Sequence, residues 1–490
     1  MKLQRMLIVL VAAAMLLSMA ACAAPTAGAT TAAATTAEAT TAAATTAAAT
    51  TTAATTAAET EPAAPVGDVT IRTSFTAGEF TDDIIALAEK EMPGIKVERA
   101  EADETKLMAM IAAGTAPDII RIYAAQTLPM WVTRNIAASI QDRIDKSTVI
   151  DESDLLPICD TCRWDGKVSG QGPLYGIPKD WSLDIAVMIS KKQFNDMGIP
   201  IPDEKTPLTI AEYVDLAKQL NELNEDGTVK VYGCGDDFAF NLMLLQSMMN
   251  QQGLSIWSDD YRKVNLNNDN VKEIFSYIYD AAINKVSGSP INPLPSYAGD
   301  VYKEGKLAMW QVGYWFTGNI RGYNQTAEQK EDRLLSQEDC MMLPALMIKS
   351  DATRISTCTH ACSGILLKQS EHPDEAWKVF EWFLGPGVQA QERAKGGWGL
   401  PSYRSLMDLL PNETDFDKQA LAVTMDEIDK SAKLYVQMNP FVNYAGAETL
   451  IKKYIDPIYS GDSTIDEALP QLERDIQLLI EEGMEIAGII

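Results

Sequence analysis

An alternation of strand and helix patterns constrains the beginning of the folded body more than any other feature. Short runs rich in Val and Ile, typical of strands, lie at 69–73, 95–98 and 118–122. The segments between them, 81–92 and 107–113, have apolar residues at helical spacing. This β-α-β-α-β order predicts a parallel, doubly wound sheet, whose ligand crevice lies beyond the carboxyl ends of the strands.

Composition limits the class of protein. The chain has 490 residues, of which 46% are hydrophobic, and its 68 Asp and Glu against 41 Lys and Arg give a net charge of −27. Such an acidic chain is not expected to bind nucleic acid. The apolar content suffices for more than one core, and no apolar run in the body is long enough to span a membrane.

Residues 1–21 have the pattern of a lipoprotein signal peptide. Lys2 and Arg5 precede an apolar run from Met6 to Ala21, which is too short for a stable membrane-spanning helix. The run ends in small residues before Cys22, similar to the lipobox of bacterial lipoproteins, and this predicts a diacylglyceryl anchor on Cys22. The alternative is plain secretion, with cleavage in the Ala-rich stretch that follows.

Residues 22–66 form the predicted lipid attachment and tether. After Cys22 the segment is almost wholly Ala and Thr, and it closes with Pro62 and Pro65. It has no large apolar side chains to bury, so we expect a disordered coil with a reach of roughly 35–40 Å. The folded body then begins at residue 67.

Two capping-box patterns mark helix starts further along, at 209–212 and 464–467. Between them, 224–227 reads as a turn into a strand. Its Asn-x-Asp-Gly order also resembles part of a calcium loop, but Gly233 occupies the place of the closing Glu, so the plain turn is the favoured interpretation.

Tryptophan is the residue that most favours a binding function. Trp181, Trp315 and Trp398 lie among polar residues or glycines, where an apolar core is a poor explanation. Aromatic faces pack on the C–H faces of sugars, so we predict that these three contact a carbohydrate. Trp377 and Trp382 lie in an amphipathic segment after Pro373 and are predicted to be core residues.

Sugar hydroxyls also need charged or amide partners. The polar residues predicted to contact the ligand are Glu79, Arg121, Tyr123, Gln126, Asp180, Tyr314 and Arg321. The alternative is that these residues are solvated surface or helix-cap positions.

The body contains six cysteines, at positions 159, 162, 234, 340, 358 and 362. An even number in an exported chain permits disulfides, and the simplest prediction is a local bridge in each close pair, 159–162 and 358–362. A zinc site formed by both pairs with His360, and redox chemistry by the first pair, are less favoured alternatives.

Catalytic motifs are lacking. The chain has two histidines and contains neither H-E-x-x-H, nor G-x-S-x-G, nor a phosphate-binding loop. We therefore expect no enzymatic activity, no cofactor and no metal, although a pair of carboxylates could still form a glycosidase site.

Five segments, taken in order, resemble the family 1 extracellular solute-binding proteins, the maltose-binding type of receptor for ABC importers. They are MAMIAAGTAPDII (108–120), LYGIPKDWSLDIAVMISKKQF (174–194), YKEGKLAMWQVGYWFTGNI (302–320), SGILLKQSEHPDEAWKVFEWFL (363–384) and GGWGLPSYRS (396–405). The likeness covers nearly all of residues 67–490.

Two departures from the family pattern concern the ligand more than the fold. Ile189-Ser190-Lys191 stands where many members have Tyr-Asn-Lys, and Asn443 separates Phe441 from Tyr444 where an aromatic cluster often faces the sugar.

The resemblance implies a periplasmic-binding-protein-like fold of the class II type, with two α/β lobes joined by a hinge. Lobe one is expected at 67–182 with 363–433, and lobe two at 189–360 with 434–490. It further implies a monomer, lipid-anchored outside the cytoplasm, that binds a carbohydrate, expected to be an oligosaccharide, between its lobes and delivers it to permease subunits. Alternatives are a peptide, a polyamine or another small solute as ligand, or a surface-anchored carbohydrate-active enzyme.

Overall fold

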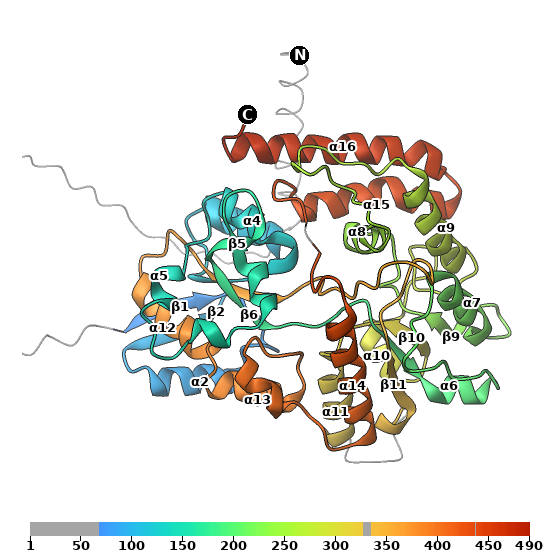
Figure 1. The fold of residues 1–490 in the computed structure, drawn as a ribbon, viewed down its shortest axis with the longest axis horizontal. Helices are drawn as coiled ribbons and strands as arrows, with labels where there is room; N and C mark the ends of the chain where they lie inside the picture. The colour runs from blue at the N-terminus through green and yellow to red at the C-terminus, as the bar shows by residue number, and fades with distance from the viewer. Residues whose placement is uncertain (1–67, 327–334, 437) are drawn as a thin grey trace, which may run out of the picture. The chain divides into compact units, whose positions relative to one another are not determined.

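The computed structural model describes residues 68–326, 335–436 and 438–490. The predicted signal peptide, Cys22 and the tether lie outside the described residues. The chain divides into two units, 1–64 and 65–490, and the helices and strands of the described residues belong to the second (Figure 1).

The first sheet begins as the sequence predicts. Its five strands run in the order β2 (Ile95–Arg99), β1 (Val69–Thr73), β3 (Ile119–Tyr123), β12 (Cys362–Leu366) and β6 (Gly176–Asp180). β1 is parallel to both β2 and β3, which confirms the predicted parallel start. β12 returns from far along the chain and lies antiparallel between β3 and β6.

Local capping sets the helices between these strands. In α2 (Asp82–Glu91) the Thr81 side chain accepts a hydrogen bond from the amide of Ile84, as expected of an N-cap. α3 (Glu104–Ala112) begins three residues before its predicted start, because Asp103 caps it in the same way.

α12 (Pro373–Leu384) carries the two tryptophans predicted to be core and packs on β12 and β1. Trp377 is 9% exposed and its ring stacks on Phe380 at 5.4 Å, which confirms the prediction. Trp382 packs on the same core but is only half-buried, because its Nε1 donates to the exposed Glu91 at 2.7 Å.

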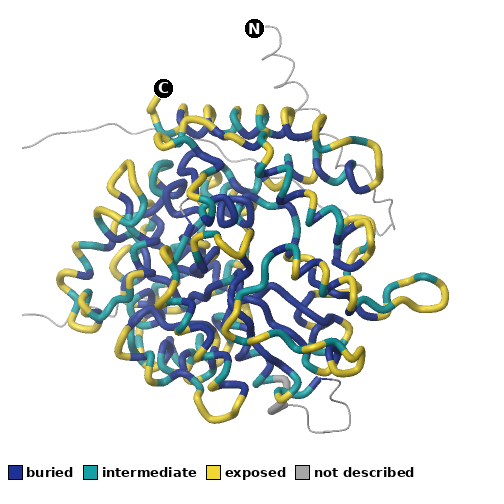
Figure 2. The backbone as a smooth tube through the Cα atoms, turned by 45° about the vertical axis from the view of Figure 1, so that its right-hand side comes forward, coloured by how far each residue is buried: buried dark blue, intermediate teal, exposed yellow. Residues whose placement is uncertain are grey.

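The second sheet has the order β11 (Cys340–Leu343), β7 (Val187–Ser190), β10 (Leu307–Gln311), β9 (Val229–Cys234) and β8 (Glu222–Leu223). β7 is antiparallel to both neighbours and β9 is parallel to β10. β8 and β9 form a hairpin through 224–227, where the Gly227 amide donates to the Asn224 carbonyl, so the predicted turn is confirmed. Every residue of β7, β10, β11 and β12 is buried (Figure 2).

Both predicted capping boxes are confirmed. Thr209 and Glu212 open α7 (Ile210–Leu220), which packs on β9, and Thr464 and Glu467 open α16 (Ile465–Ile486). α16 lies along α15 (Tyr444–Ser460), as Figure 1 shows, and buries Leu469, Leu472 and Ile476 at helical spacing.

The remaining helices are α4 (Ala124–Thr133), α5 (Gln141–Ile144), α6 (Lys191–Asp196), α8 (Leu242–Gln251), α9 (Asp269–Ile283), α10 (Ala298–Lys303), α11 (Phe316–Thr326), α13 (Val388–Gly396) and α14 (Asp415–Lys430). A small hairpin of β4 (Arg163–Trp164) and β5 (Ser169–Leu174) and 3-10 turns at Glu152–Asp154, Pro157–Cys162, Gln337–Asp339 and Arg404–Leu409 complete the elements.

α14 differs from the predicted division. The sequence analysis assigned it to lobe one, within 363–433, but it packs on β11 of the second sheet. The Gln419 side chain accepts from the amide of Met342 at 3.0 Å and donates to its carbonyl at 2.7 Å. Side-chain contacts across the chain, which sequence spacing does not show, decide this placement.

No helix in the described part of the chain combines the length and the apolar character needed to cross a membrane.

Two helical glycines test the close packing of α16. A Cβ at Gly483 would lie 1.9 Å from the carbonyl oxygen of Phe441, whereas a Cβ at Gly322 in α11 would meet nothing within 4 Å. We expect Gly483→Ala to lower the free energy of unfolding by about 1–3 kcal/mol through overpacking. Gly322→Ala, the matched control, should raise it by up to about 1 kcal/mol, since Ala favours the helix. Equal effects of the two substitutions in urea unfolding would contradict this packing.

Candidate functional site

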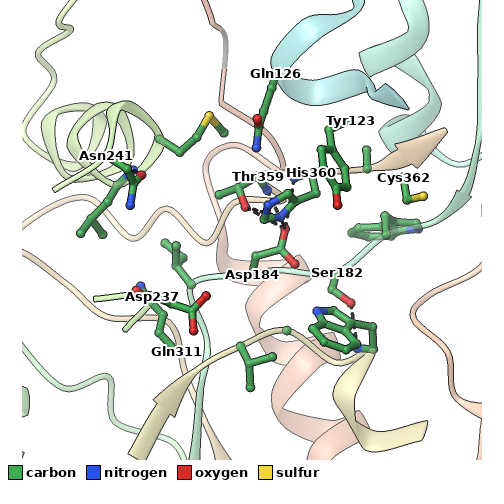
Figure 3. A pocket seen from close by; sticks show the side chains of 18 of the residues that line it. Tyr123, Gln126, Ser182, Asp184, Asp237, Asn241, Gln311, Thr359, His360 and Cys362 are labelled. Carbon is green, nitrogen blue, oxygen red and sulfur yellow. Dashed lines mark hydrogen bonds and ion pairs between the residues drawn. The ribbon is translucent and has the colours of Figure 1, made fainter. Parts of the chain in front are cut away.

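A cavity of about 600 Å³ lies between the two sheets (Figure 3). Its walls come from the ends of β3 and β6 in the first sheet, from the end of β10 and the loop after β9 in the second, and from one face of α15. The cavity therefore lies beyond the carboxyl ends of the strands, where the doubly wound pattern predicts a ligand crevice.

Eight of the ten residues predicted to contact the ligand line this cavity. They are Glu79, Arg121, Tyr123, Gln126, Asp180, Trp181, Trp315 and Trp398. The fold thus brings together residues from segments far apart in the sequence, and their role as ligand contacts stays a prediction.

The three tryptophans offer different amounts of ring surface. Trp181 is 4% exposed, and its Nε1 donates to the Pro401 carbonyl at 2.9 Å, so it mainly builds the wall. Trp315 is half-buried and is held by its amide, which donates to the Ser182 hydroxyl. Trp398 is 45% exposed and presents the most open aromatic surface of the three.

Tyr314 and Arg321, the other two predicted contacts, do not line the cavity. Tyr314 is 1% exposed and packs in the core, while its neighbour Trp315 lines the cavity. The Arg321 guanidinium donates to the buried Asp417 at 2.8 Å and to the Gly396 carbonyl at 2.8 Å. Arg321 thereby joins α11 to α14 and to the end of α13.

One end of the cavity holds a compact ion-pair network. Glu79 accepts from Arg121 Nε at 2.7 Å and lies 3.4 Å from Lys179 Nζ, and Lys179 also pairs with Asp180. Burial alone would raise the pKa of Glu79, but the neighbouring Lys179 and Arg121 lower it to about 2. Both cations are therefore neutralised by carboxylates of the protein itself.

Asp184 is a cavity residue that the sequence analysis missed. It lies in the segment between β6 and β7, and its carboxylate accepts from the Thr359 amide at 2.8 Å and the Thr359 hydroxyl at 3.0 Å. The His360 amide and Nδ1 each lie 3.2 Å from the same oxygen. Asp184 thus ties together two of the segments that connect the sheets, a contact between residues about 175 positions apart.

Asp236, Asp237 and Gln311 were also missed. The two aspartates follow β9 after Gly235 and line the cavity, while Trp310 Nε1 donates to Asp237. The surrounding walls reduce hydration and raise the pKa of Asp237 to about 6. The sequence could have indicated this pair, because polar residues just after a strand of an α/β sheet are candidates to line the ligand crevice.

The prediction of two local disulfides is wrong. All six cysteines of the described body are free and buried. Cys159 Sγ faces the Ser402 carbonyl and Cys162 Sγ faces the Ser363 hydroxyl, so the two thiols have separate partners. Burial raises the pKa of Cys162 to about 12, which also disfavours thiolate redox chemistry. Over the described ranges, no group of three or more His, Cys, Asp or Glu could hold a metal ion.

The Glu79 network gives a pH-dependent prediction. The pKa of Glu79 in the folded protein, about 2, lies below the ordinary value of a Glu side chain, about 4.5. The ion pairs therefore stabilise the fold at pH above about 4.5 and lose this effect as pH falls toward 2. Glu79→Gln should lower the free energy of unfolding by about 3 kcal/mol at pH 7, and this loss of stability should become smaller as pH falls from 4.5 to 2. Glu225→Gln, in the exposed turn, is the control and should change little. A cost for Glu79→Gln that does not vary with pH, measured by thermal unfolding, would contradict the assignment.

Comparisons with known proteins agree with this architecture. Residues 72–390, about two thirds of the chain, match the family described as bacterial extracellular solute-binding protein. No curated protein sequence matches the chain.

Solved structures share the fold at low sequence identity. An ABC substrate-binding protein from Listeria monocytogenes in complex with cycloalternan is 20% identical, with a TM-score of 0.67 over 85% of this chain and 99% of that one. The sugar-binding protein MalE from Xanthomonas citri is 19% identical, with a TM-score of 0.59 over 85% and 99%. A binding protein from B. animalis subsp. lactis Bl-04 in complex with β-1,6-galactobiose is 18% identical, with a TM-score of 0.63 over 86% and 98%.

The family match spans strands of both sheets and most of the segments that line the cavity, and the shared fold is the two-lobed fold expected from the sequence. The chain belongs to the bacterial extracellular solute-binding proteins.

Proposed function

We propose that this protein is the carbohydrate receptor of an ABC importer. The observation that carries the proposal is the cavity itself, where three tryptophans and several charged or amide side chains line one space between two sheets. A sugar presents C–H faces that pack on aromatic rings and hydroxyls that bond to polar groups, so it matches both parts of this lining. The saccharides bound to two of the similar structures support the same class of ligand.

The proposed contacts divide by chemistry. Trp398 and Trp315 offer ring surface for stacking, and Trp181 supports the wall behind them. Tyr123, at the end of β3, and Gln126, in α4, lie on the opposite side from Asp237 in Figure 3 and would bond to hydroxyls of the sugar. A ligand held from both sides would favour a closed arrangement of the lobes, because the ligand contacts both lobes at once only when the lobes approach each other.

Delivery requires partners outside this chain. We propose that the ligand-bound form docks on the permease subunits of the importer, and that the function needs no catalysis by the receptor. We also propose that residues 1–21 are removed, that Cys22 carries the lipid anchor, and that residues 22–66 hold the body near the membrane surface. The acyl chains would supply the membrane affinity, at about 0.8 kcal/mol per buried CH₂.

Ligand screening tests the proposal. We expect mono- or oligosaccharides, rather than peptides or polyamines, to raise the melting temperature, since ligand at 100 times Kd adds about 2.7 kcal/mol to the free energy of unfolding. Trp398→Ala should weaken the binding of the best saccharide about tenfold or more, because it removes the most open ring of the cavity.

Trp382→Ala is the matched control, since that tryptophan lies on α12 outside the cavity lining. It should leave the affinity unchanged. Stabilisation by peptides or polyamines alone would overturn the carbohydrate proposal.

A further inference from the structure

The charges lining the cavity do not balance. Six carboxylates line it, from Glu79, Asp180, Asp184, Asp236, Asp237 and Glu448, against the two cationic side chains Arg121 and Lys179. Both cations already pair with Glu79 or Asp180. Even with a protonated His360 beside Asp184, the lining keeps an excess of negative charge.

The excess is concentrated after β9 of the second sheet. Asp236 and Asp237 form no ion pair with any Lys or Arg of the described residues. Trp310 Nε1 donates to the Asp237 carboxylate, and the charge of a protonated His360 favours its ionised form. Burial is the main cause of the raised pKa of Asp237, and the nearby charge of Asp236 raises it further, so the charged form of Asp237 is disfavoured. A ligand cation at this position would relieve that repulsion.

Aromatic rings border the same place. Tyr297 lines the cavity, lies edge-on to Trp310 at 5.8 Å between ring centroids, and is 53% exposed. Burial raises the pKa of Tyr297, and the charges of Asp237, Asp300 and Asp236 raise it further, which places its side chain near the pair. An aromatic face beside carboxylates is an environment that suits an ammonium group, because the ring quadrupole attracts a cation.

A second, independent feature indicates a different ligand group close by. Gln311 directly follows Trp310, lines the cavity and is only 6% exposed, yet its Nε2 has no hydrogen-bond partner in the described structure. A buried amide N–H without an acceptor is costly, so the bound ligand is expected to supply one. An ammonium group cannot accept a hydrogen bond, whereas a hydroxyl or ring oxygen can.

We infer that the ligand is an amino sugar, whose ammonium group lies against Asp236 and Asp237 and whose oxygen accepts from Gln311 Nε2. The inference rests on the proposed carbohydrate-binding function and narrows it to a cationic class. A polyamine would satisfy the carboxylates but offers Gln311 no acceptor. A neutral sugar would satisfy Gln311 but leaves the negative charge uncompensated, and an anionic sugar would add to it.

Matched sugar pairs test this inference on the full mature chain. Each pair differs by an ammonium in place of a hydroxyl at one position of each sugar unit: glucose and glucosamine, galactose and galactosamine, mannose and mannosamine, and cellotriose with the fully deacetylated chitin trimer. Spermidine is the polyamine probe. Titration calorimetry at pH 6.5 should show at least tenfold tighter binding of the amino member in the pair that binds best. At this pH the amino groups of the monosaccharides are mostly protonated, and Asp237, with its pKa of about 6, is mostly ionised.

The variant Asp237→Asn separates charge from structure. An Asn side-chain oxygen can still accept from Trp310 Nε1, so the wall should keep its geometry while the preference for the amino member falls at least tenfold. Asp236→Asn should act in the same direction. Asp215→Asn, on the exposed face of α7, is the matched control and should leave the preference unchanged.

The outcomes distinguish the two proposals. Equal or tighter binding of the neutral members, or a preference that survives both Asp237→Asn and Asp236→Asn, would overturn the amino-sugar inference and leave carbohydrate binding standing. Binding of no saccharide in the panel would overturn the amino-sugar inference, and binding of spermidine alone would overturn both proposals.

Discussion

The cavity depends on the link that Asp184 makes between two connecting segments. The chain leaves the first sheet through 181–186 and returns to it through 356–361, and the Asp184 carboxylate accepts hydrogen bonds from the returning segment. The Asp184 amide also donates to the Thr357 carbonyl, and the Cys358 amide donates to the Leu434 carbonyl. The two connecting segments therefore lie together beside the cavity, and the chain around Leu434, between α14 and α15, lies against the returning one.

The two ends of the cavity differ in electrostatic character for a structural reason. On the first sheet, Glu79 and Asp180 come from elements that also bring Arg121 and Lys179, so charges are paired within the protein before any ligand arrives. On the second sheet, the loop after β9 brings two carboxylates and no cation to pair with them among the described residues. The first end is preorganised by its own ion pairs, whereas the second leaves charge for a partner to compensate.

Some aromatic residues pack in the core and others line the cavity, and the local sequence distinguishes the two groups only in part. Trp377 and Trp398 are both tryptophans of the C-terminal half, yet one stacks in the core and the other lines the cavity with nearly half of its surface exposed. Helical apolar spacing around Trp377 and flanking glycines around Trp398 predicted this difference. The same reasoning did not separate Tyr314 from Trp315, because adjacent residues in a turn share their flanking sequence. Only tertiary packing decides that Tyr314 lies in the core and that Trp315 lines the cavity.

The sequence by itself determined the features that arise from neighbouring residues. These are the parallel start of the first sheet, the capped helix starts at Thr81, Thr209 and Thr464, and most of the aromatic and charged residues around the cavity, because periodicity, capping and strand ends are local properties. Tertiary structure alone decided the antiparallel insertion of β12, the packing of α14 on the second sheet, the free thiols, and the convergence of Asp184, Asp237 and Gln311 on one space. Each of these depends on contacts between segments tens to hundreds of residues apart, whose geometry no local pattern encodes.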